Sequence, residues 1–400
     1  MISIKLSAFS DLLQILCVAG LCIFLSISCI NGKKTPVSTA DASVKVNLAK
    51  EALKHELVIV HPGDPEAVPQ ELELLQYFDD KGNPHRYSLW VDSVICRDKT
   101  CEIVKVELFW DAFGQYDKYF VEKGEALTKL EHVPFSKEDH VKLQRILKDK
   151  ESPLREVTKD GLVGQKAKSA VDGVAGATVL TLSSTVVVGA GYTCYDLWHW
   201  ANGEVSEIIR SLSGKTTSID RLQQLLKSGK EDIVLFAVEN LKARRVFDEL
   251  TKNALVEAVK KGGDELIAAA LEYLNEASEN SADYFESVQT IYSDCSSKQR
   301  VYISTALTKD ERSVPKGFYN GLSMSIKDLD SYHEVHLLLS LFENKKAWSE
   351  EIESNVIKLL DHPKFFFSRR AYWFLKKHQL NAENKKSLEA YFKKHQFRLL

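Results

Sequence analysis

Apolar residues recur at every second position in one segment of the first half of the chain. Between residues 104 and 110, apolar side chains occupy every second position, and Lys105, Glu107 and Phe109 fill the positions between them. A period of two is typical of a strand with one buried face. Residues 88–96 are rich in β-forming residues, and a polar turn at 97–100 joins the two segments. The pattern predicts a β-hairpin, with more strand and loop over 113–134.

Apolar residues recur at helical spacing further along the chain. Ser136 is a predicted N-cap, because Asp139 follows three residues later, and an apolar helix face follows over 141–147. From about residue 204 the chain consists of helix-sized segments joined by short polar turns. Three of these segments have the apolar positions Ile219, Leu222, Leu225 and Leu226; Ile233, Phe236, Ala237 and Leu241; and Ile352, Val356, Leu359 and Leu360. We expect Ser349 to cap the last of them.

These patterns predict an α+β chain with two domains. An antiparallel-sheet domain is expected at 62–203, and an all-α helical repeat or bundle domain at 204–400. The length of 400 residues is too great for one ordinary core and agrees with this division. Paired helices of this length favour an α-solenoid of the HEAT kind, with an irregular bundle as the alternative.

The N-terminus has the layout of a secretory signal. Lys5 precedes an apolar run over 12–27, which stops at Ser28 and Cys29. Residues 25–29 resemble a lipobox, although Ser26 stands where an aliphatic residue is usual. We therefore predict a signal peptide at 1–28 and a lipidated Cys29, followed by a polar tether at 29–61. An uncleaved membrane anchor and an ordinary cleaved signal are the alternatives. All three readings predict a protein exported to the periplasm or cell exterior.

Charge and cysteine usage narrow the function classes. The formal net charge is −3 and no dense basic stripe is evident, which argues against nucleic acid as a partner. Cys96 and Cys101 flank the predicted hairpin turn, so a disulfide that staples the hairpin is the favoured interpretation in an oxidising compartment. A redox-active pair lacks the Cys-x-x-Cys spacing, and a metal site lacks a second pair of ligands nearby. The histidines match no common metal motif.

One segment of small residues carries the candidate chemistry. Residues 171–178 read Val-Asp-Gly-Val-Ala-Gly-Ala-Thr, with Gly173 and Gly176 three positions apart. Such a turn allows a close backbone approach, and it can present N–H groups and the Thr178 hydroxyl to a phosphate. From the residues alone, a plain glycine-rich turn between two elements is the competing interpretation.

The same segment resembles the flavinylation motif of FMN-binding domains. These domains occur in the flavin-carrying subunits of sodium-pumping NADH:quinone oxidoreductase and of Rnf-type complexes. Asp172, Gly176, Ala177 and Thr178 match the family pattern, while Ala175 stands where the family has Ser or Thr. The resemblance implies that a flavin transferase esterifies Thr178 to the phosphate of FMN. It also implies a sheet-rich module before the motif and a helix after it, for which the aromatic segment 191–200 is the candidate.

Two functions follow from these observations. The first is an exported, membrane-anchored flavoprotein with covalent FMN, which relays electrons to an unknown redox partner as a component rather than as a stand-alone enzyme. The second is a lipoprotein without flavin, whose helical domain binds another protein as a scaffold. The residue that discriminates between them is Ala175, because the missing hydroxyl bears on recognition by the transferase. We expect the aromatic residues of 191–200, and also Cys194 in the same stretch, to serve as core.

Overall fold

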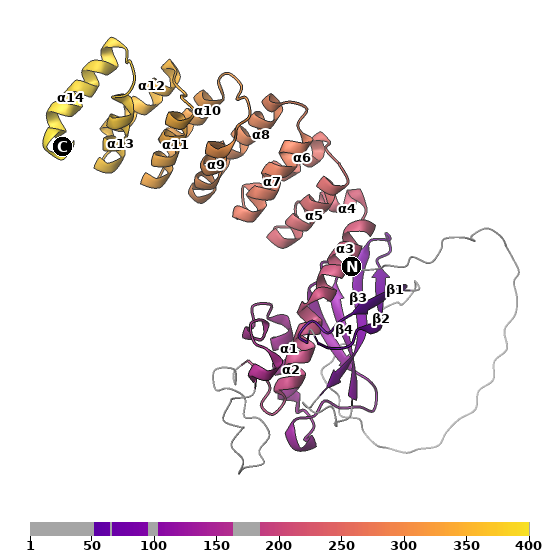
Figure 1. Cartoon of the computed structure of the whole chain (residues 1–400). Coiled ribbons are helices and arrows are strands. Elements are labelled where there is room, and N and C mark those ends of the chain that lie inside the picture. Colours follow the sequence, from indigo (N-terminus) through magenta and orange to yellow (C-terminus); the bar gives the residue numbers. More distant parts are fainter. Residues whose placement is uncertain (1–51, 65, 95–102, 163–184, 400) are drawn as a thin grey trace, which may run out of the picture. The chain divides into compact units, whose positions relative to one another are not determined.

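The first half of the chain is built on one antiparallel sheet (Figure 1). The computed structural model describes residues 52–64, 66–94, 103–162 and 185–399. Five strands follow each other in sequence order across the sheet. They are β1 (Leu53–Ile59), β2 (Gln70–Phe78), β3 (Pro84–Val94), β4 (Ile103–Asp111) and β5 (Tyr116–Val121). The predicted α+β class, with a sheet first and helices afterwards, is confirmed.

The burial of side chains along β4 follows the alternation from which this strand was predicted. Val104, Val106, Leu108 and Trp110 are buried, and the residues between them are more exposed. Strand β4 pairs with β3, with Leu89 opposite Leu108 and Val91 opposite Val106. The predicted hairpin is therefore present, although its turn and both Cys96 and Cys101 lie outside the described residues.

The sheet begins earlier than the sequence indicated. Strand β1 lies within the range 29–61 that we assigned to the tether, and its Leu57 and Ile59 are buried. The strand pairs antiparallel with β2 along its whole length. Its alternation is weak in the sequence because the polar residues Lys54, His55 and Glu56 follow one another. The sheet-containing part of the chain thus starts at Leu53.

Two of the sheet's turns use the same chemistry. Asp79 and Asp111 each begin a turn in which a glycine, Gly82 or Gly114, follows three residues later. In both turns the aspartate Oδ1 accepts the N–H groups of the residues two and four positions on. Both glycines have φ near +77°, at 78° and 76°, in the left-handed region that glycine adopts without strain.

The surroundings of these two glycines differ, and this difference yields a prediction. A Cβ on Gly82 would meet no atom within 4 Å, whereas one on Gly114 would fall on the carbonyl oxygen of Ser206. We expect Gly82→Ala to cost about 1 kcal/mol from backbone strain alone. Gly114→Ala should cost about 1–3 kcal/mol more, because the backbone must also shift. Urea unfolding of the two variants measures the difference, and equal destabilisation would contradict the close approach.

Two helices cover one face of the sheet. They are α1 (Lys137–Lys148) and α2 (Gly191–Asn202), which pack on each other, and α2 lies against β3 while α1 lies against β5. Ser136 caps α1 in a full capping box with Asp139, as predicted. Trp110 of β4 is completely buried beneath α2, and its indole Nε1 donates to the carbonyl oxygen of Ala201 at 2.7 Å. This core fixes α2 on the sheet.

The second half of the described chain is helical throughout. The two compact units divide between Glu207 and Ile208, within α3. The helices are α3 (Glu204–Thr216), α4 (Ile219–Leu225), α5 (Glu231–Ala243), α6 (Glu249–Val259), α7 (Asp264–Ala277), α8 (Ser281–Asp294), α9 (Ser297–Lys309), α10 (Phe318–Met324), α11 (Tyr332–Asn344), α12 (Glu350–Val356), α13 (Phe365–Leu375) and α14 (Ala382–Leu399). None of the helices within the described ranges is long and apolar enough to span a bilayer.

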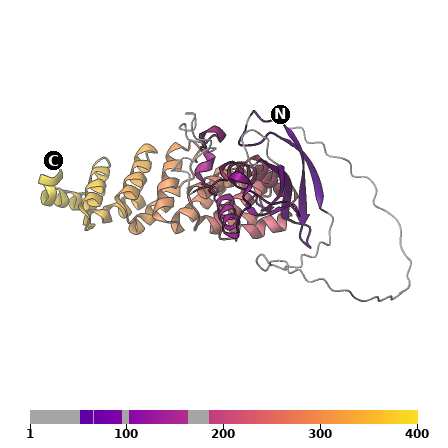
Figure 2. The ribbon, with the colours of Figure 1, turned by 90° about the horizontal axis from the view of Figure 1, so that it is seen from below.

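These helices form two rows of a stacked array (Figures 1 and 2). Helices α5, α7, α9, α11 and α13 contact each other in succession, and α6, α8, α10 and α12 form the second row. A stack in which each helix touches its neighbours differs from a bundle closed around one core. The segment predicted as one helix over 349–360 is instead α12, capped by Ser349, which tightens into a 3-10 turn over Ile357–Asp361.

A buried ion pair joins two neighbouring helices of the array, α9 and α11. The Arg300 Nε of α9 donates to Glu334 Oε1 of α11 at 2.8 Å, and both side chains are buried. Glu334 also accepts the Ser331 N–H in the capping box of α11. Although burial raises the pKa of Glu334, the hydrogen bonds from Arg300 and the nearby serines outweigh this effect and hold it below its usual value. The carboxylate therefore stays charged and paired at neutral pH.

Candidate functional site

The residues predicted to carry the flavin lie outside the described part of the chain. These are Asp172, Gly173, Gly176, Ala177 and Thr178, and the predicted lipidation site Cys29 lies outside it as well. The described chain stops at Leu162 and resumes at Thr185. The described residues that border this range are those around Leu162 and Thr185.

The helix expected after the motif is present as α2. It begins at Gly191, and Tyr195, Trp198 and Trp200 are buried, which confirms that these aromatic side chains form core. Cys194 is completely buried, and burial raises the pKa of its thiol to about 12. Because the thiolate is the reactive form, this cysteine is a packing residue rather than a nucleophile.

A buried polar cluster lies where α2 meets the segments that border the undescribed range. Asp196 of α2 is only 2% exposed, and Lys159 Nζ lies 3.0 Å from its Oδ1 atom. Lys159 begins the 3-10 helix Lys159–Leu162, which ends the described chain before residue 163. This ion pair thus joins the last turn before the undescribed range to the first helix after it. We call His61, Lys159, Tyr195, Asp196 and His199 the α2 cluster.

His61 completes the cluster from the end of β1. Its Nδ1 accepts the N–H of Gly63 at 3.1 Å, so in the neutral ring the proton lies on Nε2, which faces Asp196 Oδ1 at 3.7 Å. The imidazole edge packs on Trp200, with ring centroids 5.0 Å apart. The Tyr195 hydroxyl donates to the Gly63 carbonyl oxygen at 2.9 Å. A Cβ on Gly63 would lie 2.7 Å from ring atoms of Tyr195 and His199, so the backbone approaches α2 as closely as glycine permits.

Burial sets the charge state of this cluster. Desolvation, aided by the positive charge of Lys159 and by His199, lowers the pKa of His61 to about 4. Burial likewise lowers the pKa of His199 and raises that of Tyr195. At neutral pH the two imidazoles are uncharged, and the carboxylate is balanced by Lys159. No group of three or more His, Cys, Asp or Glu suited to a metal ion occurs within the described ranges. The Lys159–Asp196 ion pair and the Tyr195 hydrogen bond hold three chain segments together.

The low pKa of His61 predicts a pH-dependent stability. The folded pKa of about 4 lies below the value of 6.5 for a free histidine, so the unfolded state binds more protons between these values. Stability is then fully present above pH 6.5 and falls as the pH drops towards 4, by about 3 kcal/mol in total for this group. We expect His61→Gln to reduce this loss in urea titrations between pH 7 and pH 4.5. The matching change at the exposed His85 should leave it unaltered, and an unchanged slope in His61→Gln would refute the assignment.

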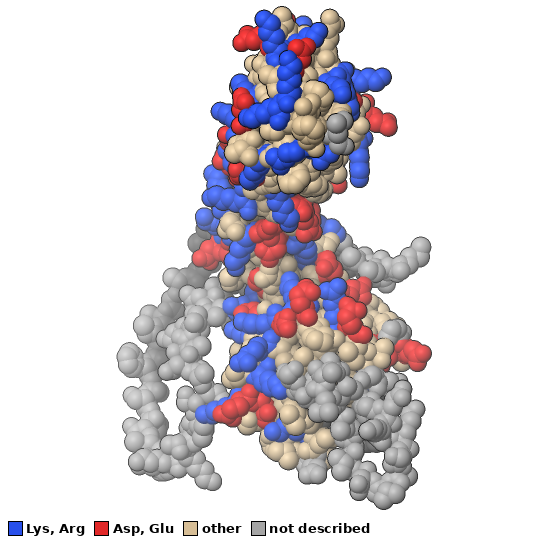
Figure 3. All heavy atoms as spheres, turned by 90° about the vertical axis from the view of Figure 1, so that its left-hand side faces the viewer, with Lys and Arg blue, Asp and Glu red and all other residues tan. Residues whose placement is uncertain are grey.

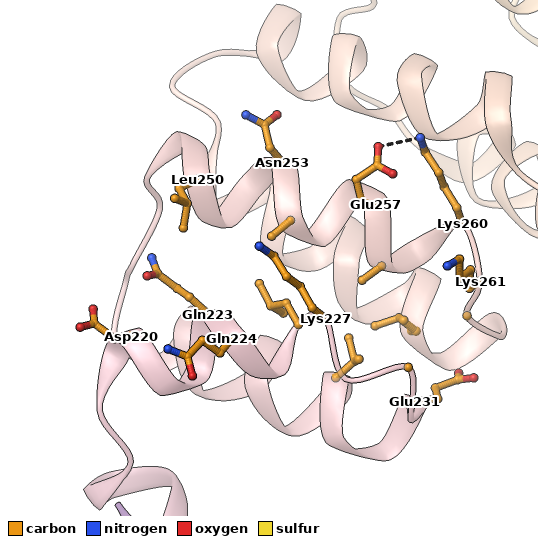
Figure 4. Close-up of a pocket in the computed structure, with 17 residues that line it drawn as sticks. Asp220, Gln223, Gln224, Lys227, Glu231, Leu250, Asn253, Glu257, Lys260 and Lys261 are labelled. Atoms are coloured by element: carbon orange, nitrogen blue, oxygen red, sulfur yellow. Dashed lines mark hydrogen bonds and ion pairs between the residues drawn. The ribbon is translucent and has the colours of Figure 1, made fainter. Parts of the chain in front are cut away.

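A second candidate site lies in the helical unit, between α4 and α6. A cavity of about 940 Å³ opens there, and its floor is apolar, with Leu226, Val234, Ala254, Ala258 and Leu266. Figure 4 shows Lys227 extending from the end of α4 into this space, with Gln223, Asn253 and Glu257 around it. Gln223 bridges one end of the gap, since its Nε2 donates to Thr251 Oγ1 at 2.8 Å. An apolar floor with a polar rim is suited to an apolar side chain of a bound peptide.

No protein-family model, curated protein or solved structure matches this chain. The assignment of function therefore depends on the residues and geometry described above.

The α2 cluster was not found by sequence reasoning, because residues 61, 159 and 196 are far apart in the chain. The lowered pKa of His199 and its contact with the Tyr195 ring agree with a packing role for this histidine. One signal was available in the sequence. Asp196 is the only acidic residue in the aromatic stretch 191–200, and a carboxylate on a buried helix face needs a cationic partner.

Proposed function

We propose that this chain is an exported, membrane-anchored flavoprotein that carries FMN on Thr178 and relays electrons. The observation that carries the proposal is the order of elements around the motif. A five-stranded antiparallel sheet precedes residues 172–178, and helix α2 follows them, which is the order implied by the resemblance to FMN-binding domains. Anchoring through a lipid on Cys29 would keep the flavin at a membrane surface, facing the periplasm or cell exterior.

The α2 cluster supports this proposal through its position. The Lys159–Asp196 ion pair joins the two described ends of the chain that border 163–184. Leu162, the last described residue before this range, is buried, and so is Val187, which lies just after it. Both described ends of the chain are therefore part of the core. The described elements before and after this range therefore pack on each other.

The roles of the chain's own residues follow from their chemistry. FMN supplies the redox chemistry when it is bound. The Thr178 hydroxyl provides the oxygen of the phosphoester, and the small residues Gly173, Gly176 and Ala177 allow close approach of the backbone. Asp172 matches the acidic position of the family motif. Ala175 cannot donate the hydrogen bond of the usual Ser or Thr, so modification is expected to be less efficient than in family members that have the hydroxyl.

Mass spectrometry tests the proposal directly. The protein is isolated from a host that exports it and contains an active flavin transferase, and the peptide containing Thr178 is analysed. A peptide mass increased by esterified FMN supports the proposal, together with a yellow, fluorescent protein. An unmodified peptide beside a transferase shown to modify another acceptor would rule out covalent flavin for this chain.

The cavity between α4 and α6 favours a second function, that of a protein-binding scaffold. Its apolar floor and polar rim form a site for an extended or helical peptide of a partner, a redox protein included. A photo-crosslinking residue at the exposed, cavity-lining Asn253 tests this function, with the same residue at the exposed Lys123 of the sheet unit as control. Discrete adducts at 253 and none at 123 are expected for a partner bound in the cavity.

A further inference from the structure

The C-terminal end of the helical array is strongly basic, although the chain as a whole is acidic, so the expectation that the chain has no dense basic stripe is wrong for this end. Residues 363–400 contain ten lysine and arginine residues and two glutamates, a net charge of +8. Since the whole chain has a net charge of −3, the remaining residues carry −11. In the upper part of Figure 3, where the C-terminal helices of the array face the viewer, lysine and arginine atoms predominate over acidic ones.

Helix α14 carries five of these ten basic residues, and all five are exposed. One face of α14 packs on α13, where Tyr391 stacks on Tyr372 and donates to Ser368 Oγ at 2.8 Å. The helical period places Lys386, Lys393 and Phe397 on the opposite face, and all three are exposed. Because α14 is the last helix of the described stack, no further helix of that stack covers this face.

The charges of α14 are not neutralised within the described chain. Further in, Arg370 and Lys377 share Glu343, at 2.9 and 3.0 Å. By contrast, no ion pair with a described acidic residue involves the four lysines of α14, which are Lys385, Lys386, Lys393 and Lys394. These exposed ammonium groups repel each other, and an anionic surface would relieve that repulsion.

Exposed aromatic side chains stand among these lysines. Phe397 is 90% exposed, the highest value among the large apolar side chains of the described residues. Phe392 and Trp373 are also exposed, and the Lys376 ammonium lies 4.9 Å from the centre of the Trp373 ring. Single aromatic rings interspersed with lysines are typical of surfaces that partition into the headgroup region of a bilayer.

A groove beside α14 gives this surface a place for a headgroup. It has a volume of about 560 Å³ and runs between α13 and α14, with Lys376, Lys385 and Lys393 among its lining residues and Phe392 at its wall. Glu389 is its one acidic lining residue. Three ammonium groups around an apolar wall are suited to a phosphate attached to an acyl chain.

We propose that the end of the array binds the surface of an anionic lipid bilayer. The terminal basic surface consists of Lys376, Lys385, Lys386, Lys393, Lys394 and Phe397. Lipid rather than an acidic protein is favoured because the apolar side chains are isolated from each other, whereas a stable protein interface has a continuous apolar centre. Lysines, as compact point charges on long flexible stems, suit a diffuse layer of phosphates. The acidic remainder of the chain would be repelled, so contact occurs through this end of the array.

Vesicle sedimentation tests the proposal on residues 29–400 with Cys29→Ser, which lack both the predicted signal peptide and the predicted lipid. Phosphatidylcholine vesicles with and without phosphatidylglycerol are compared at low and high salt. We expect preferential binding to anionic vesicles that salt suppresses. The variant Lys386→Glu/Lys393→Glu/Lys394→Glu should bind them at least roughly a hundredfold more weakly, since each lysine near an anionic leaflet contributes about fivefold and each glutamate adds repulsion. Phe397→Ser should weaken binding without changing its salt dependence.

The matched control reverses three exposed lysines of the sheet unit, in Lys123→Glu/Lys137→Glu/Lys150→Glu, and so changes the net charge equally. It should bind anionic vesicles as the Cys29→Ser parent does, and far-UV circular dichroism verifies that both triple variants are folded. Equal binding to both vesicle types, or equal weakening in the control, would overturn the proposal. Retention on immobilised polyglutamate without binding to anionic vesicles would also overturn it, and would assign the surface to an acidic polypeptide. The outcome does not depend on flavin attachment.

Discussion

Replacing Thr178 by valine is expected to remove all covalent flavin from the protein. Valine keeps the shape of the side chain but lacks the oxygen that would form the phosphoester, so no other atom at this position can hold the phosphate. The measured quantity is the flavin that remains with the protein after denaturation, together with the mass of the peptide that contains residue 178. Wild-type protein from the same host should retain flavin, and the variant should retain none.

Two further variants in the same segment sharpen this result. Thr181→Val removes a hydroxyl three residues away and should leave flavinylation unchanged, because the motif ends at Thr178. Ala175→Ser restores the hydroxyl of the family motif and should increase the modified fraction. If Thr178→Val kept its flavin while Thr181→Val lost it, the acceptor would be misassigned. If neither the parent nor Ala175→Ser were modified by an active transferase, the flavoprotein proposal would fail.

Replacing Trp110 by alanine is expected to destabilise the sheet unit by about 3–5 kcal/mol. The indole is completely buried between β4 and α2, so its removal leaves a cavity that the surrounding strands cannot fill. The Ala201 carbonyl oxygen keeps a partner in Ser206, whose Oγ donates to it at 3.1 Å. The loss is therefore mainly one of packing. Urea unfolding of the full chain, followed by near-UV circular dichroism, measures it.

The control for Trp110 is the same substitution at Trp90. This tryptophan lies on the neighbouring strand β3, is 41% exposed, and points to the face of the sheet away from α2. Trp90→Ala should cost about 1 kcal/mol, because less apolar area is lost and no closed cavity forms. A similar cost for the two variants would mean that the face covered by α2 is not the main core of this unit.

Trp110 and His61 both contact helix α2. Trp110 fixes the end of α2 near Ala201 on the sheet, and the α2 cluster fixes its middle to the segment after β1 and to Lys159. A shift of α2 would disturb both contacts together. Comparing the flavin content of Trp110→Phe with that of Thr178→Val would then separate a loss of the frame from a loss of the acceptor atom.

The sequence by itself determined the kinds of element and their order. The period-two pattern of 104–110 predicted β4 because a strand with one covered face needs an apolar side chain at every second position. Ser136 and Ser349 predicted helix starts because a hydroxyl can accept the free N–H groups of a first turn, and both residues act as caps. The sequence also supplied the candidate acceptor Thr178, since that inference needs only a local motif.

Only the tertiary structure decided which distant residues meet. His61, Lys159 and Asp196 come together because β1, the turn before residue 163 and α2 pack on one core, and no local pattern encodes such a contact. The strand β1 was assigned to the tether because its pairing with β2, rather than its own weak alternation, stabilises it. No local pattern of the sequence shows which lysines of α14 stay exposed together. The exposure of Lys386 and Lys393 on one open face depends on α14 packing through Tyr391 at the end of the stack, because burial of one side of a helix determines which side remains for solvent.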